Sequence, residues 1–264
     1  MMSRESVQRV FPTMAAPVQS FPRSVKSKAR VQKISEYLPL PSVWYGDDSE
    51  LLERLLDFYP RKKPRRILDS TVNAGRFWNG SKRPIIGLDL DPRYRPSLVA
   101  DNTAMPFRNA WFDVVVYDPP HIPNQGKDNQ KDFGRRFGLV LSSAKENQYT
   151  FTHTFPPFLK EAYRVIKEEG ILLAKITDYV HHHRYQWAHI ELISAACRAG
   201  FTPCDCIVKI RKSPIIDPKW KTAHLSRRQH CYWLIWCRTL SGSACPSASD
   251  RASMNHCLRA ATSN

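Results

Sequence analysis

Residues 112–121 read FDVVVYDPPH, and this segment gives the clearest indication of the fold. Its first six residues are apolar apart from Asp113, and three of them are consecutive valines. Such a run is typical of a strand that is buried on both faces in the middle of a parallel sheet. The Asp-Pro-Pro sequence ends the strand, because proline lacks the amide hydrogen that a sheet ladder needs. We therefore predict a central strand at 112–117 that stops before Asp118.

Strand-like and helix-like segments alternate on both sides of this strand. Further strands are predicted from apolar and β-branched residues at 66–69, 84–89, 97–101, 171–176, 204–210 and 230–237. Helices are predicted from apolar residues at helical spacing at 48–58, 157–167 and 185–198. This alternation predicts an α/β fold with a mostly parallel, doubly wound sheet. A basic loop without a helix joins the last two strands, so we expect the final strand to be antiparallel.

Flanking segments differ in composition from this alternating region. Residues 1–35 carry seven bases, one acid and three prolines, and we expect a disordered basic arm there. A mitochondrial targeting segment is the alternative for this arm. Residues 241–264 are rich in serine and alanine and are expected to be a disordered tail. The domain is then 36–240, with a long insertion loop at 121–155.

An aspartate stands at the end of four of the predicted strands: Asp69, Asp89 and Asp101 are the last residues of theirs, and Asp118 directly follows the strand at 112–117. The carboxyl ends of parallel strands meet at one edge of an open sheet, which is where ligands bind. A single aspartate at such a position is often only a helix cap. Four in successive strands favour a ligand that offers hydroxyl and amino hydrogens, rather than a bare phosphate.

The tetrad at 118–121 resembles a known motif, in which Asp, Asn or Ser precedes two prolines and an aromatic residue or histidine. This motif belongs to the S-adenosylmethionine-dependent amino methyltransferases of the N6-adenine and N4-cytosine type. The resemblance extends over roughly residues 36–238. It implies a Rossmann-like class I methyltransferase domain with seven strands, the last antiparallel, and S-adenosyl-L-methionine as cofactor.

The resemblance also implies a cofactor shell formed by residues of the first three strand ends and the loop at 69–75. These are Asp69, Thr71, Asn73, Gly75, Asp89 and Asp101. In the family, proline, phenylalanine and glycine stand where this chain has Ser70, Thr71 and Asn73. Asparagine tolerates the left-handed backbone better than other non-glycine residues, so the turn can persist.

The chemistry of amino methylation explains the tetrad. An exocyclic amino nitrogen is a poor nucleophile because its lone pair is delocalised into the base. By resemblance, Asp118 and the carbonyl of Pro119 accept the amino hydrogens and stabilise the positive charge that grows during transfer. Pro120 stiffens the turn, and His121 offers a flat face for an extruded base. We predict these four residues as the catalytic group.

The net charge of +16 lies mainly outside the segments with the strand-end acids. Bases gather in the arm, in the run at 61–66 and in the loops at 121–155 and 209–228. Cations that bind phosphates, interleaved with aromatic rings, are typical of nucleic-acid surfaces. We predict contacts to DNA, or alternatively RNA, from Lys127, Lys131, Arg135, Arg136, Lys209, Arg211, Lys212 and Trp220.

Other classes of protein are disfavoured by the sequence. No apolar run reaches the roughly 18 residues of a membrane span. Seven irregularly spaced cysteines favour reduced thiols and a cytoplasmic protein. The run at 181–183 is three histidines without a metal-binding spacing, so no metal is expected. Cys204 follows a proline but opens a strand, and we expect it to be a packing residue rather than a nucleophile.

The predicted function is methyl transfer to an exocyclic amino nitrogen of a DNA base, N6 of adenine or N4 of cytosine. An RNA base-amino methyltransferase is the first alternative. A catalytically inactive, nucleic-acid-binding protein of the same fold is the second. Lys175 and Asp178 end the strand beside the crevice, where either a substrate contact or an exposed salt bridge is compatible with the sequence.

Overall fold

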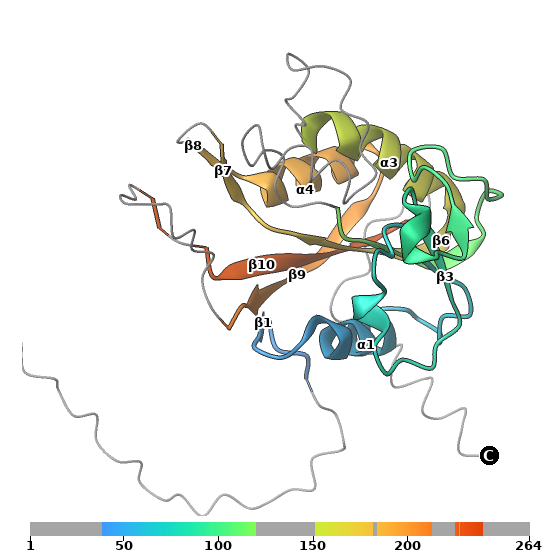
Figure 1. Cartoon of the computed structure of the whole chain (residues 1–264), viewed down its shortest axis with the longest axis horizontal. Helices are drawn as coiled ribbons and strands as arrows, with labels where there is room; N and C mark the ends of the chain where they lie inside the picture. Colours follow the sequence, from blue (N-terminus) through green and yellow to red (C-terminus); the bar gives the residue numbers. More distant parts are fainter. Residues whose placement is uncertain (1–38, 120–150, 182–183, 213–224, 227, 240–264) are drawn as a thin grey trace, which may run out of the picture. The chain divides into compact units, whose positions relative to one another are not determined.

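A computed structural model describes residues 39–119, 151–181, 184–212, 225–226 and 228–239, without the side chains of 151–154 and 181. The chain divides into two compact units, and the described helices and strands belong to the second, Leu40–Asn264. Its sheet has eight strands in the order β1-β9-β10-β6-β5-β2-β3-β4, and β7 and β8 form a separate two-stranded ribbon (Figure 1).

The strands of the large sheet are β1 (Val43–Trp44), β2 (Ile67–Asp69), β3 (Ile85–Asp89), β4 (Leu98–Val99), β5 (Phe112–Tyr117), β6 (Ile166–Ile176), β9 (Thr202–Ile210) and β10 (His230–Cys237). The ribbon consists of β7 (Tyr179–His181) and β8 (Arg184–Gln186). The helices are α1 (Asp48–Phe58), α3 (Phe151–Val165) and α4 (Ala188–Arg198), with short 3-10 turns η1 (Arg76–Trp78) and η2 (Pro92–Tyr94).

Strand β5 is the buried centre of the sheet, as its sequence predicts. Five of its six residues are buried, and it pairs in parallel with β2 on one side and with β6 on the other. Strand β10 is antiparallel to both of its neighbours, β6 and β9, which confirms the predicted reversal at the end of the domain. The α/β, Rossmann-like class of the prediction is confirmed.

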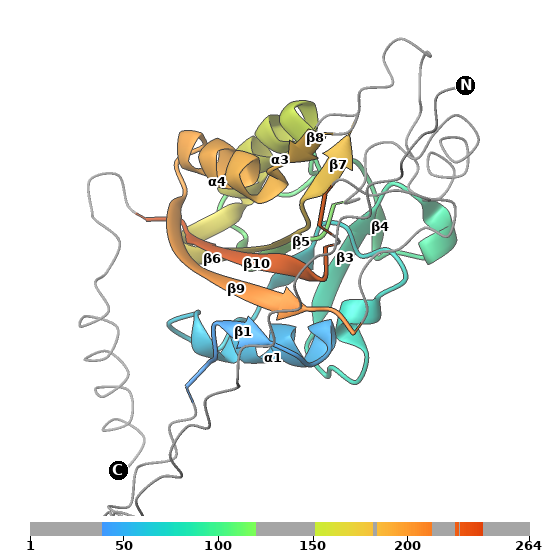
Figure 2. The same ribbon diagram turned by 90° about the vertical axis from the view of Figure 1, so that its left-hand side faces the viewer.

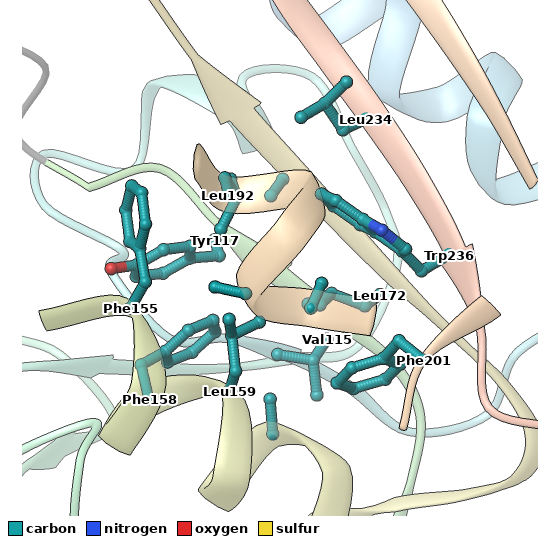
Figure 3. Packing of buried hydrophobic residues seen from close by; sticks show 14 of the residues in the cluster. Val115, Tyr117, Phe155, Phe158, Leu159, Leu172, Leu192, Phe201, Leu234 and Trp236 are labelled. Carbon is teal, nitrogen blue, oxygen red and sulfur yellow. The ribbon is translucent and has the colours of Figure 1, made fainter. Parts of the chain in front are cut away.

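Helices cover both faces of the sheet (Figure 2). Helix α1 buries four leucines, Leu51, Leu52, Leu55 and Leu56, against Trp233 and the other apolar side chains on one face. Helices α3 and α4 cover the opposite face, where aromatic and aliphatic side chains interdigitate (Figure 3). Burying each such large apolar side chain contributes about 1.5–3 kcal/mol, so both faces are firmly held.

The strand count differs from the expected seven. The extra strand, β1, has only two residues and pairs in parallel with β9, so it lies at the edge of the sheet. Helix α3 begins at Phe151 rather than near Pro157, because Phe155 extends the buried helix face formed with Phe158. Helix α4 begins at Ala188 rather than near Tyr185, because the preceding residues form β8.

The cysteines also differ from expectation. Cys204 of β9 and Cys237 of β10 form a disulfide, so the prediction of thiols alone is wrong for this pair. The two residues lie on neighbouring strands with their Cα atoms 6.3 Å apart, within disulfide reach. Among the other described cysteines, Cys197, Cys206 and Cys231 are free thiols. Within the described residues, no helix has the length and apolarity that crossing a bilayer requires.

Candidate functional site

The four predicted aspartates lie at one edge of the sheet. Asp69 and Asp89 are the last residues of β2 and β3, Asp118 directly follows β5, and Asp101 follows β4 by two residues. The strands occupy adjacent places in the order β5-β2-β3-β4 and are parallel, so their carboxyl ends coincide. The structure therefore brings these acids to a common edge, as the sequence predicts.

The loop between β2 and η1, residues 70–75, is named the glycine loop here and contains a left-handed turn. Asn73 has φ of 49° and Gly75 has φ of 67°. The side chain of Asn73 accepts a hydrogen bond from the amide of Ala74 at 2.9 Å, which helps an asparagine hold this conformation. A Cβ atom added at Gly75 would meet no heavy atom within 4 Å, so the loop has open space in front of it. The departure from glycine at position 73 thus leaves the turn intact.

Asp89 and Asp101 have different local partners. The two carboxylate oxygens of Asp89 accept the backbone amides of Asn73 at 2.8 Å and of Asp91 at 3.0 Å, which ties the glycine loop to the end of β3. One oxygen of Asp101 accepts both the amide and the hydroxyl of Thr103. Asp101 is exposed, and within the described residues its other oxygen has no hydrogen-bond partner. Asp101 thus faces solvent with acceptor capacity to spare.

Asp69 is only 1% exposed and lies behind the loop. Its carboxylate accepts the indole hydrogen of Trp78 at 2.7 Å and the amide of Thr71 at 3.1 Å. Burial raises the pKa of Asp69 to about 7, the charges of Asp118 and Asp89 add to this rise, and the two hydrogen bonds oppose it. Asp69 therefore supports the loop from inside and carries a carboxyl group that titrates near neutrality.

The turn after β5 is tied directly to the glycine loop. The amide of Asp118 donates to the hydroxyl of Thr71 at 2.7 Å, and Pro119 is buried. This bond holds the predicted reacting turn beside the predicted cofactor loop, although 47 residues separate its two ends in the chain. The other two members of the tetrad, Pro120 and His121, lie outside the described residues.

A row of charged groups continues from Asp118 across the α1 face of the sheet. Lys175 of β6 is 9% exposed, and its ammonium bonds to Asp48 at 2.9 Å. Lys209 of β9 lies 3.2 Å from the same Asp48 oxygen, and Trp233 donates to the other oxygen at 2.9 Å. Burial opposes charge on both Asp48 and Lys175. For Asp48, the attraction of Lys175 outweighs burial and lowers the pKa of the carboxyl group. For Lys175, the attraction of Asp118 and Asp48 outweighs burial and raises the pKa of the ammonium group.

An aromatic row at the same edge was not predicted from the sequence. The rings of Tyr185, Trp187, His189 and Tyr232 follow one another with centroids 4.7, 6.1 and 4.1 Å apart. Buried Asp178 anchors the row, because it bonds to the His189 ring at 2.7 Å and accepts the Tyr185 hydroxyl at 3.0 Å. An exposed salt bridge at Asp178 is therefore excluded, because this carboxylate is only 1% exposed and bonds to these two rings.

Trp187 stands out within this row because it is 55% exposed, although core tryptophans of this chain are almost fully buried. In the sequence, this tryptophan stands directly before an amphipathic helix. Periodicity alone does not distinguish a tryptophan at this position from a core residue. The structure thus places a solvent-accessible ring, in contact with Tyr185 and His189, near the end of β6.

The predicted nucleic-acid contacts fall into two groups. Lys209, Arg211 and Lys212 lie at the carboxyl end of β9, on the same edge as Asp118. The others, Lys127, Lys131, Arg135, Arg136 and Trp220, lie outside the described residues. The basic run at 61–66 directly precedes β2 and therefore lies at the opposite edge. There Arg65 and Arg66 donate backbone amides to Asp113, and Arg66 stacks on Trp111.

Among known proteins, solved structures resemble this chain in fold. No protein-family model matches the chain, and no curated protein matches it. A solved SAM-dependent methyltransferase from Methanosarcina mazei has 12% identity and a TM-score of 0.43, over 66% of this chain and 92% of that one. TrmN from Thermus thermophilus has 16% identity and a TM-score of 0.41, over 72% and 48%.

A candidate DNA modification methylase from Thermus thermophilus is also similar, with 16% identity and a TM-score of 0.34 over 56% of this chain. The chain spans about half the length of that protein, 53%. The same Thermus protein has also been solved with S-adenosyl-L-methionine. These values are too low to transfer a function, so we infer the function from the residues of the site.

Proposed function

We propose that the chain transfers a methyl group from S-adenosyl-L-methionine to an exocyclic amino nitrogen of a nucleic-acid base, with DNA adenine N6 or cytosine N4 as the first expectation. One observation carries the proposal: the hydrogen bond of 2.7 Å that fastens Asp118 to Thr71 of the glycine loop. It holds the turn that resembles the amino-methylating motif beside the loop that resembles the cofactor site. Both lie at the ligand-binding edge of the sheet.

The chain's own groups suit the cofactor. Gly75 leaves open space for close approach of a ligand, and exposed Asp101 keeps a carboxylate oxygen for an amino hydrogen. Asp89 uses one lone pair of each oxygen on backbone amides and retains the others for hydroxyl groups. The bound cofactor supplies an electrophilic methyl group on a sulfonium.

Asp118 has two tasks in this proposal. It accepts a hydrogen of the amino group, which localises the nitrogen lone pair toward the methyl carbon, and it stabilises the positive charge that develops there until the nitrogen releases that hydrogen as a proton. The backbone amide of Asp118 is held by Thr71, so the position from which its carboxylate extends is fixed before the substrate arrives. Pro119 contributes its carbonyl as a second acceptor, and His121 contributes a stacking face, both by resemblance.

The left-handed turn predicts the effect of substitutions at Asn73. We expect Asn73→Gly to bind S-adenosyl-L-methionine within about twofold of wild type, because glycine adopts positive φ freely. Asn73→Val should bind about 5- to 30-fold more weakly, since a left-handed β-branched residue costs about 1–2 kcal/mol or more. Titration calorimetry measures both. If Asn73→Val bound the cofactor as tightly as the wild type does, the loop would not be part of the cofactor site.

The aromatic row is suited to stacking on an unpaired base near the site. Arg184 and Arg228 lie beside the row as cations. We expect Trp187→Ala to weaken binding of a single-stranded oligonucleotide about 5- to 100-fold, because stacking contributes about 1–3 kcal/mol per base. Trp187→Phe should retain most of the affinity. Phe58→Ala removes another exposed ring, at the far end of α1, and should have no effect. Unchanged affinity of the alanine variant would refute stacking at Trp187.

Methyl labelling separates the proposal from its two alternatives. DNA and RNA are incubated with the protein and the labelled cofactor, and the nucleosides are identified by mass spectrometry. Labelled N6-methyladenosine or N4-methylcytidine in the deoxy series supports the proposal. Label in RNA alone supports the RNA enzyme. Nucleic-acid binding without label, and without cofactor binding in calorimetry, supports the inactive protein.

A further inference from the structure

A polar pocket of about 230 Å³ opens at the carboxyl edge of the sheet, beside the charged row. It lies between the start of α1, the end of β9 and the start of β10, and Lys175 of β6 also lines it. Strand β6 separates this pocket from β5, and β5 in turn separates it from β2 and the glycine loop. The pocket is therefore distinct from the predicted cofactor site.

Four cations line this pocket: Lys175, Lys209, Arg211 and Lys212. Two acids, Asp47 and Asp48, also line it. Asp48 is already engaged, because its oxygens accept from Lys175 and Trp233, with Lys209 close by. The lining therefore keeps an excess of positive charge after its internal ion pairs are formed.

The outer two cations of the pocket are available to a ligand. Within the described part of the chain, neither the guanidinium of Arg211 nor the ammonium of Lys212 has a hydrogen-bond or ion-pair partner. The backbone of Arg211 is nevertheless fixed, because its amide donates to the carbonyl of Gln229 at 2.7 Å and its carbonyl accepts the Gln229 side chain at 3.3 Å. A fixed backbone with a free guanidinium suits the bidentate binding of an oxyanion.

The pocket adjoins the proposed reacting turn. In the parallel pairing of β5 with β6, Val116 lies beside Leu173 and Tyr117 beside Ala174. The next step of this register brings Asp118 beside Lys175, which lines the pocket. An anion bound among the pocket cations thus lies next to the turn that is proposed to hold the base.

We propose that this pocket binds a backbone phosphate of the substrate strand, that of the target nucleotide or of its immediate neighbour. The inference rests on the proposed function, because it needs a nucleic-acid substrate. Phosphodiester anions match the excess positive charge, and a phosphate held here anchors the strand while its base occupies the site beside Asp118. Arg211 and Lys212 bind the phosphate, while Lys175 and Lys209, neutralised in part by Asp48, support the base of the pocket.

The test replaces one phosphate at a time. Fluorescence anisotropy measures binding of single-stranded DNA oligonucleotides of about twelve nucleotides, each with one uncharged methylphosphonate linkage. For wild type, one or two positions should weaken binding at least about fivefold more than the rest. Arg211→Gln should bind the unmodified strand about 5- to 10-fold more weakly, with a salt slope lower by about 0.7. A methylphosphonate at a position that is sensitive in the wild type should weaken binding by Arg211→Gln less than about twofold further.

Lys62→Gln is the matched control, since it removes one exposed cation of the basic run at the opposite edge. It should keep the position-dependent pattern of the wild type. Equal sensitivity of wild type and Arg211→Gln to every methylphosphonate would overturn the pocket assignment. So would a loss of S-adenosyl-L-methionine affinity in Arg211→Gln by calorimetry, since the pocket would then serve the cofactor.

The outcomes separate this inference from the proposed function. If the wild type methylates DNA but Arg211→Gln binds and reacts as the wild type does, the pocket assignment fails and the function stands. If the wild type binds neither DNA nor RNA oligonucleotides, both fail together. If a methylphosphonate at one position weakens binding by the wild type but not by Arg211→Gln, the pocket assignment is supported. This holds whether or not the modified base is the expected one.

Discussion

Asp118→Ala is expected to lower the rate of methyl transfer by a factor of about 10² to 10³ and to leave cofactor affinity within about twofold. The substitution removes the acceptor that stabilises charge on the amino nitrogen. It keeps the backbone amide of Asp118, which is the group that bonds to Thr71, so the glycine loop remains fastened to the turn. Lys175 loses one neighbouring charge but keeps Asp48 as its ion-pair partner.

Two measurements are needed for this variant, because loss of turnover alone would also follow from misfolding. Single-turnover transfer gives the chemical step, and calorimetry with S-adenosyl-L-methionine gives binding. Asp118→Asn is the conservative comparison: its amide keeps one acceptor oxygen, and the motif that the tetrad resembles admits asparagine, so it should retain part of the rate. Full turnover of the alanine variant would exclude Asp118 from the reaction.

The sequence predicts those parts of the fold in which local pattern and burial agree. The four leucines of α1 lie at helical spacing, and the helix has the predicted bounds, Asp48–Phe58. Strand β5 is apolar apart from Asp113 because both of its faces are covered, and this too is readable from the residues alone. The shared edge of Asp69, Asp89 and Asp118 follows from parallel pairing, which the alternation of strands and helices predicts.

Other features depend on contacts between distant segments. Strand β1 has two residues, too few for any periodic signal, and exists because β9 offers it a parallel partner. Asp48 bonds to Lys175 across 127 positions and to Trp233 across 185, so the charged row arises only after three elements have packed. In sequence, Asp48 is simply an acidic residue in the first turn of a helix. The bonded group of Asp48, Lys175 and Trp233 beside the pocket therefore cannot be recognised from any local sequence pattern.

Asp69 is expected to make the stability of the protein depend on pH between about 4 and 7. Its folded pKa, raised to about 7, lies above the value of about 3.9 in the unfolded chain. As pH rises through this window, the unfolded state loses its proton first, so the free energy of unfolding falls, by up to about 4 kcal/mol from this residue. Below the window the contribution is fully favourable, and above it the contribution is lost.

Asp69→Asn removes this titration and tests its sign. The amide loses one acceptor, so the hydrogen bond from Trp78 fails, at a cost of about 1–3 kcal/mol that does not vary with pH. The variant should be less stable than the wild type near pH 4 and equally or more stable near pH 8, as measured by urea unfolding across this range. Glu168→Gln, which removes an exposed carboxylate, is the comparison variant. A difference between Asp69→Asn and the wild type that stays constant with pH would mean that Asp69 ionises in the folded protein as it does in the unfolded chain, and that burial behind the loop does not hold its proton.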